Sequence, residues 1–80
     1  MRLDKFLKVS RIIKRRTVAN EACDNGRVIV NGKTARASYD IKIGDIIEIS
    51  FGERVFKAEV TLVTEVIRKE DTVSMYKILE

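Results

Sequence analysis

Apolar residues near the start of the chain recur with the period of an α-helix. On a helix of 3.6 residues per turn, one stripe is formed by Leu3, Phe6, Leu7, Ser10 and Ile13. Basic residues project from the opposite side, at Lys5, Lys8, Arg15 and Arg16. We therefore expect an amphipathic helix over residues 2–13 with one core face and one cationic face. Asp4 precedes Lys8 by four residues, which predicts an ion pair worth roughly 0.2–0.5 kcal/mol along this helix.

A second, shorter helix is predicted over residues 17–25. Thr17 stands where an N-cap belongs, and Asn25 followed by Gly26 is a typical stop signal. A narrow stripe of small side chains suits close packing on the first helix, and consists of Val18, Ala19, Ala22 and Cys23. The two helices are joined by a tight turn that is basic at every position from 14 to 16.

From residue 27 the apolar period changes from helical to alternating. Asn31 and Gly32 separate two short alternating runs, and this pair supplies the two positive φ angles that a type I′ hairpin turn needs. We expect Lys33 at the tip of this hairpin and Arg36 further along its return strand.

The remainder of the chain predicts further strands. Residues 38–45 are typical of a loop, residues 46–51 of a strand, and residues 54–63 of a half-buried strand that follows a turn. Residues 68–71 are polar and predict a solvated turn. Residues 72–80 suit either a capped helical turn or a closing strand, and we favour the strand.

These elements predict an α+β fold, in which two N-terminal helices pack on a small, bent antiparallel sheet of about four or five strands. The 80 residues fit one domain, and the composition of 45% hydrophobic and 35% charged residues is that of a globular chain. No apolar run is long enough to span a bilayer, and the N-terminus lacks a signal peptide. We therefore expect a cytoplasmic protein that makes no membrane contact.

Residue types that support catalysis or metal binding are scarce. The chain has no histidine, and its single cysteine, Cys23, lies on the small-residue stripe and is expected to be a buried hydrophobe. The acidic residues are spread singly along the predicted strands and turns. We expect no enzyme activity, no metal site and no cofactor.

Basic charge is concentrated in the first helix and the turn after it. Residues 1–16 hold seven Lys or Arg against one Asp, whereas the remaining residues hold nine against eleven acidic side chains. A helix start carries partial positive charge, so each cation placed there costs about 0.3–1 kcal/mol. A bound phosphate would relieve this conflict, which makes the basic turn the main sign of nucleic-acid binding.

Four motifs in order and at the right spacing resemble the S-four RNA-binding domain family, which has the αL-type RNA-binding fold. They lie at residues 2–7, 15–22, 25–32 and 44–47. The resemblance implies a single domain over residues 1–80, with the motif core at 2–47 and additional strands at 48–80.

The resemblance also implies a function, because stand-alone bacterial members of this family act in ribosome-associated quality control. Such a member binds a large ribosomal subunit obstructed by peptidyl-tRNA and contacts its rRNA and tRNA. It supports C-terminal poly-alanine tailing of the stalled chain by an RqcH-type tailing factor. We expect the chain to act as a monomer.

The residues expected to bind RNA follow from the basic element and the matching motifs. They are Arg2, Lys5, Lys8, Arg11, Lys14, Arg15, Arg16 and Thr17, with Lys33 and Arg36 as secondary candidates. The cationic helix face, the basic turn and the hairpin tip are expected to lie on one side of the molecule. Asp4 has a second interpretation, in which it orients Arg or Lys side chains and does not touch RNA.

Two other functions stay open on the sequence. The chain could be an RNA-binding accessory subunit of a separate RNA-modifying enzyme, or an interaction module whose cationic helix binds an acidic protein groove.

Overall fold

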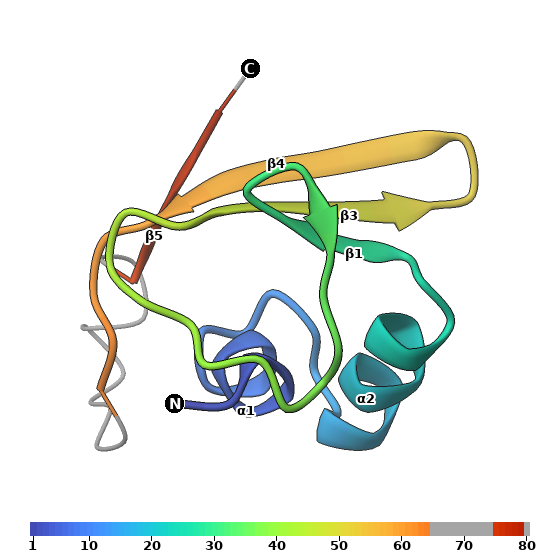
Figure 1. Ribbon diagram of the computed structural model, residues 1–80, viewed down its shortest axis with the longest axis horizontal. Coiled ribbons are helices and arrows are strands. Elements are labelled where there is room, and N and C mark those ends of the chain that lie inside the picture. The colour runs from blue at the N-terminus through green and yellow to red at the C-terminus, as the bar shows by residue number, and fades with distance from the viewer. Residues whose placement is uncertain (65–74, 80) are drawn as a thin grey trace.

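The fold is that of a computed structural model, which describes residues 1–64 and 75–79. Two short helices form one layer and an antiparallel sheet forms the other (Figure 1). The elements are α1 (Leu3–Val9), α2 (Arg16–Asp24), β1 (Val28–Val30), β2 (Lys33–Thr34), β3 (Ile46–Phe51), β4 (Arg54–Val60) and β5 (Tyr76–Ile78). The strand order is β2-β1-β3-β4-β5, with every neighbouring pair antiparallel. The predicted α+β fold is confirmed.

The first helix ends four residues earlier than predicted. It ends at Val9, because Arg11 adopts a left-handed backbone conformation with φ of 65°. The backbone N–H of Ile13 then donates to the carbonyl of Leu7 at 3.0 Å, and this folds the chain back. Ile13 is still delivered into the core, but by a turn and not by the helix. The turn has the further effect of directing the chain into α2.

The second helix begins one residue before its predicted cap. Arg15 is the extended residue at the N-cap, and Thr17 lies within the first turn. The predicted stop is confirmed, because Gly26 has φ of 74° directly after Asn25, as a helix-ending αL residue does. Val18 is 47% exposed, so its assignment to the packing stripe is wrong, whereas Ala19, Ala22 and Cys23 do pack toward the core.

The hairpin between β1 and β2 has the predicted turn. Asn31 and Gly32 have φ of 52° and 83°, and Val30 pairs directly with Lys33 across the two-residue loop. The return strand β2 is only two residues long, so the prediction that places Arg36 on it is wrong. The neighbours of Arg36 in sequence are buried alanines, and Arg36 itself is exposed.

The later strands follow the predicted order with one shorter than expected. The strand β3 matches its prediction at both ends, and β4 ends at Val60, three residues early. Residues 76–78 form β5, which confirms the strand interpretation for that part of the C-terminal segment. The polar segment 68–71 lies outside the described residues, as do residues 72–74 and 80.

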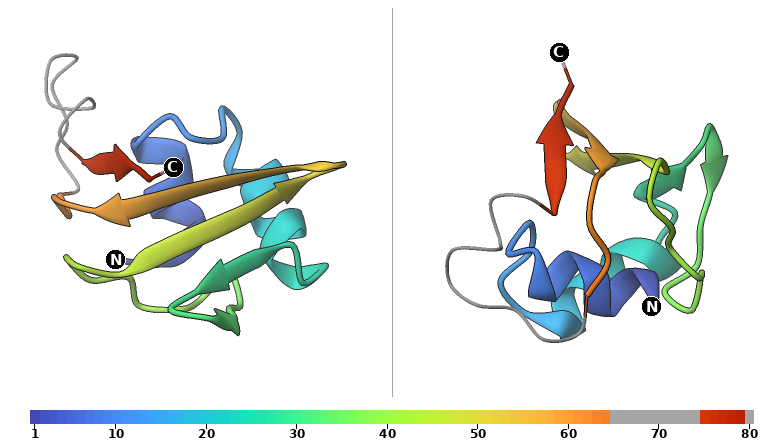
Figure 2. Two further views of the ribbon diagram at one scale, coloured as in Figure 1. Left: turned by 90° about the horizontal axis from the view of Figure 1, so that it is seen from above. Right: turned by 90° about the vertical axis from the view of Figure 1, so that its left-hand side faces the viewer.

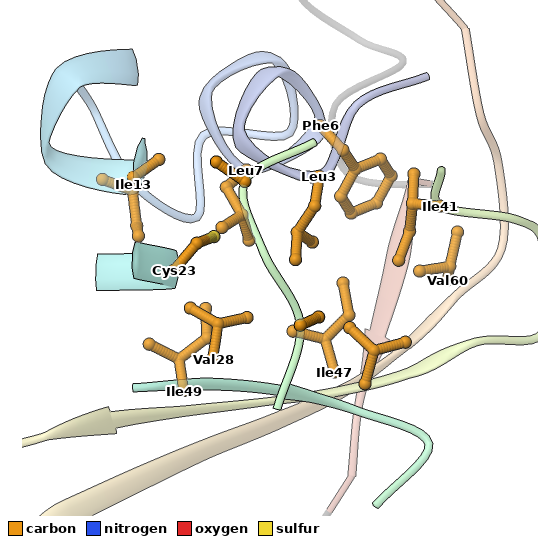
Figure 3. Packing of buried hydrophobic residues seen from close by; sticks show 14 of the residues in the cluster. Leu3, Phe6, Leu7, Ile13, Cys23, Val28, Ile41, Ile47, Ile49 and Val60 are labelled. Atoms are coloured by element: carbon orange, nitrogen blue, oxygen red, sulfur yellow. The ribbon is translucent and has the colours of Figure 1, made fainter. Parts of the chain in front are cut away.

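The core lies between the two layers, where side chains of α1 point toward the sheet (Figure 3). Leu3, Phe6 and Leu7 are fully buried, which confirms their assignment to packing. They meet Ile47 and Ile49 of β3 within one cluster. Figure 2 shows both helices lying against the same face of the sheet. None of the helices in the described segments combines the length and the apolar character that crossing a membrane requires.

Candidate nucleic-acid interface

The two helix starts meet at the side chain of Asp4, which is only 2% exposed. Arg2 donates from Nε to Oδ1 at 3.1 Å and from Nη2 to Oδ2 at 3.4 Å. Arg16, from the start of α2, donates from Nε to Oδ2 at 3.4 Å. Asn20 donates from Nδ2 to the same oxygen at 3.1 Å, and the backbone N–H of Lys5 donates to Oδ1 at 2.8 Å. One carboxylate therefore joins segments that are up to 18 residues apart.

These contacts hold the pKa of Asp4 below its ordinary value of 3.8. Burial acts in the opposite direction and is the largest single influence, but the hydrogen bonds from Asn20, Arg2, Arg16 and the Lys5 backbone together outweigh it. Asp4 is thus ionised at neutral pH. The predicted pair with Lys8 is not among the bonds of this carboxylate, and the orienting interpretation of Asp4 fits its contacts.

Asp4 also changes the charge balance expected at the basic turn. The predicted concentration of cations over residues 1–16 is partly neutralised, because Arg2 and Arg16 both form ion pairs with Asp4. One carboxylate faces two guanidinium groups, so the cluster keeps a net positive charge. The two arginine side chains are 50% and 48% exposed, and Arg16 contacts Asp4 through Nε only. Both Nη atoms of Arg16 are therefore available to a ligand.

The backbone at the start of α2 adds hydrogen-bond donors beside these arginines. The N-cap residue Arg15 makes no side-chain cap, and the first turn holds no acidic residue. Within the part of the chain that is described, the N–H groups of Thr17 and Val18 meet no acceptor. Such donors, together with the partial positive charge of a helix start, form a favourable position for a phosphate.

The start of α1 is different, because its backbone donors are already used. The N–H groups of Leu3 and Asp4 donate to the carbonyls of Tyr39 and Ala37, at 2.7 and 3.2 Å. The N-terminal ammonium also bonds the carboxylate of Asp40 at 2.8 Å, and this hydrogen bond lowers the pKa of Asp40. An anion would therefore meet free backbone N–H groups at α2 and not at α1.

An open hollow of about 360 Å³ lies at the junction of the two helices. Its lining residues are Asp4, Arg16, Thr17, Asn20 and Glu21. Asn20 and Glu21 were not predicted from the sequence, because an exposed polar residue within a helix is normally solvated. The one available signal was the position of Asn20 one turn after Arg16, on the same side of the helix.

The other predicted cations lie in several parts of the fold. Along the segment from α1 to the start of α2, four side chains are exposed and form no ion pair within the described residues: Lys8, Arg11, Lys14 and Arg15. Lys5, on α1, is half-buried.

The β1–β2 hairpin, with Lys33 at its tip, lies in the sheet layer, whereas the start of α2 is at the far edge of the helix layer (Figure 1). The arrangement does not bring Lys33 beside the basic turn. Arg36 is closer, because the loop after it bonds the start of α1.

The motif residues that follow the helices have a structural role. Asn31 in the hairpin turn accepts a bond from the Ile46 backbone at 2.9 Å and donates to Asp45 at 3.0 Å. The Asn-Gly and Gly-Asp motifs thus hold each other in place. Among the described residues no group of three or more His, Cys, Asp or Glu could hold a metal ion.

Comparison with known proteins places the basic element within a known domain. A model of the S4 domain matches residues 1–47. The chain belongs to the S4 domain family. The matched region contains both helices, the hollow between them and the β1–β2 hairpin.

Curated relatives match over nearly the whole chain and carry the name RQC P-site tRNA stabilizing factor. That of Halalkalibacterium halodurans is 51% identical over 98% of this chain and 89% of its own length. That of Bacillus subtilis is 49% identical over 100% of this chain and 93% of its own length. That of Streptococcus pneumoniae is 52% identical, covering 99% of this chain and 90% of its own length.

Two solved structures share the fold. The trimeric structure of Vibrio cholerae heat shock protein 15 superposes with a TM-score of 0.89 at 26% identity, over 99% of this chain and 81% of that one. The solution structure of the hypothetical protein HP1423 gives a TM-score of 0.84 at 29% identity, over 100% of this chain and 98% of that one.

Proposed function

We propose that this chain is a non-catalytic RNA-binding factor of ribosome-associated quality control that binds tRNA together with ribosomal RNA. The observation that carries the proposal is the start of α2, where Arg15, Arg16 and unpaired backbone N–H groups lie beside an open hollow. The match to the S4 domain supports RNA as the ligand. The relatives' name, RQC P-site tRNA stabilizing factor, supports tRNA within that class.

The proposed binding mode is recognition of the RNA backbone. A phosphate at the start of α2 accepts bonds from the free N–H groups and from the Nη atoms of Arg16. Lys14 and Arg15 contact neighbouring phosphates of the same RNA strand. Lys8 and Arg11 contact phosphates further along that RNA strand. Because these contacts reach phosphates and not base edges, they recognise the shape of folded RNA more than its sequence.

The finer role follows from the same assignment. The chain binds a large ribosomal subunit obstructed by peptidyl-tRNA, contacts both rRNA and tRNA, and supports poly-alanine tailing by an RqcH-type factor. It acts in the cytoplasm as a monomer. Arg2, Lys5, Thr17 and Arg36 complete the proposed RNA-binding surface, and Lys33 contacts a separate part of the same particle.

The test is co-sedimentation of tagged protein with large ribosomal subunits over a series of salt concentrations. Arg16→Glu should abolish binding at moderate salt, because it reverses a charge at the proposed phosphate site. Arg54→Glu is the matched control, since Arg54 is exposed at the start of β4 in the sheet and its change in charge is identical. For the unchanged chain, affinity should fall steeply with salt, with a logarithmic slope of roughly 0.7–0.9 per phosphate contacted. Equal binding by the Arg16 and Arg54 variants would show that the site is wrongly placed.

The material that co-purifies with the protein separates this function from the two alternatives. Large-subunit rRNA together with tRNA and attached nascent chains supports the proposal. Recovery of one RNA-modifying enzyme, without tRNA or nascent chains, would support an accessory subunit. A protein partner that stays bound after nuclease digestion would support an interaction module.

A further inference from the structure

We propose that Asp4 is a positioning residue, which holds Arg2 and Arg16 in the orientation that RNA binding requires. This inference rests on the proposed function of the same surface, and it assigns a role in RNA binding to a buried acidic residue. Asp4 is 2% exposed, so its carboxylate is not itself an RNA contact.

The carboxylate is fixed on both of its oxygen atoms. The backbone N–H of Lys5 donates to Oδ1 at 2.8 Å, and Asn20 donates to Oδ2 at 3.1 Å. Neither donor is an arginine, so these two bonds hold the acceptor in place from α1 and from α2 independently of the cations. The carboxylate of Asp4 is therefore held in a fixed position, where it can accept hydrogen bonds from flexible side chains.

The two arginines attach to this point through their Nε atoms. Arg2 lies just before α1 and Arg16 begins α2, and their Nε atoms donate to Asp4 at 3.1 and 3.4 Å. A guanidinium group is planar, so a bond at Nε restricts the directions in which its Nη groups point. Among the described residues, the Nη atoms of Arg16 form no hydrogen bond with another side chain or with the backbone. The hydrogen bond at Nε therefore sets the direction in which these Nη atoms point. The arrangement presents two half-exposed cations in one preformed pair.

When Asp4 is replaced, a positioning role and a purely electrostatic role predict changes in RNA affinity of opposite sign. Removing a negative charge beside a polyanion site strengthens binding if Asp4 acts only through its charge. If Asp4 positions the arginines, its removal frees two long side chains that must then be ordered when RNA binds. Ordering two such side chains weakens binding by roughly 5- to 100-fold. The direction of the change therefore distinguishes the two roles.

The experiment measures binding of fluorescently labelled tRNA to the full chain and to Asp4→Asn, which keeps the side-chain shape and removes the charge. The matched control is Glu53→Gln, which also removes one negative charge, from an exposed turn between β3 and β4. We expect weaker binding by Asp4→Asn and equal or slightly tighter binding by Glu53→Gln. Thermal unfolding of each variant reports whether the fold is retained.

A double-mutant cycle separates positioning from a purely structural role. In a chain that already carries Arg2→Gln and Arg16→Gln, Asp4→Asn should cause no further loss of binding, because the guanidinium groups that Asp4 positions are gone. A structural role would lower binding in both backgrounds. If Asp4→Asn does not fold, Asn20→Ala serves instead. It removes one bond to the carboxylate without changing charge, and should weaken binding about 2- to 5-fold only when Arg16 is present.

The outcomes distinguish failure of the inference from failure of the proposed function. If the unchanged chain binds neither tRNA nor large subunits, the proposed function is wrong and the inference fails with it. If the unchanged chain binds, and Asp4→Asn binds equally or more tightly, the positioning role alone is overturned. A loss that persists in the background without the two arginines overturns it as well.

Discussion

Removal of the Phe6 ring is the most direct test of how the helices are held on the sheet. Phe6 is 0% exposed and packs in the cluster that joins α1 to the strands (Figure 3). Replacing a buried Phe by Ala costs about 3–5 kcal/mol, because the transfer energy of the ring is lost and a cavity remains. A chain of 80 residues has a total stability of roughly 4–12 kcal/mol. Phe6→Ala should therefore remove much of the free energy of unfolding.

The measurement is unfolding by urea and by heat, with circular dichroism as the signal that reports the folded fraction. In a domain of this size, each 1 kcal/mol corresponds to a shift in Tm of about 4–8 °C. Phe6→Leu provides a milder change of about 1–2 kcal/mol and should stay folded at room temperature. Since Phe6 is two residues from Asp4 on α1, loosening this helix should also weaken RNA binding near the unfolding transition.

The matched control is Phe51→Ala at the end of β3. Phe51 is 48% exposed, so the same chemical change should cost only about 1 kcal/mol. The reasoning is refuted if Phe6→Ala lowers Tm no more than Phe51→Ala does, because the ring of Phe6 would then not be part of the core.

Three further predictions concern single residues. The pKa of Asp4 in the folded chain is lowered from its ordinary value of 3.8. Ionised Asp4 therefore stabilises the fold above pH 3.8, and this contribution is lost as the pH falls through the lower pKa of the folded state. In urea unfolding, the stability difference between the unchanged chain and Asp4→Asn should shrink toward pH 2, and a constant difference would contradict this. Burial raises the pKa of Cys23 to about 11, so its thiol should resist an aromatic disulfide reagent at pH 8 until denaturant is added. Rapid labelling of the native chain would show that α2 is not packed as described. Asn31→Ala should destabilise by about 1–2 kcal/mol in the same unfolding assay, since it loses bonds to Ile46 and Asp45, while Thr34→Ala, at an exposed position, should have little effect.

The sequence predicted the order of the elements better than their ends. The stop at Gly26 and the Asn31-Gly32 turn were correct, because a positive φ at these residues depends on local chemistry. The end of α1 was wrong, because Ile13 continues the helical stripe in sequence although it reaches the core from a turn. An apolar stripe reports burial, and two different backbone paths can bury the same residue.

The sequence also identified the basic segment but not its internal connections. The high local density of Lys and Arg is visible in the chain, and so is the conflict with the dipole of α2. The Asp4–Lys8 pair was the wrong partner choice, because spacing along one helix considers only neighbours on that helix. Of the true side-chain partners of Asp4, Arg2 lies before the first helix, and Arg16 and Asn20 come from the second helix.

By itself, the sequence determined which segments are helix and strand, where the sharp turns fall and where positive charge collects, because each of these depends on residues close together in the chain. Only the tertiary structure decided that Asp4 holds Arg2 and Arg16 together, and that the β1–β2 hairpin lies in the other layer from the start of α2. The physical reason is that these relations are set by how the two helices pack on one sheet. That packing is directed by a core of residues drawn from both helices and most of the strands.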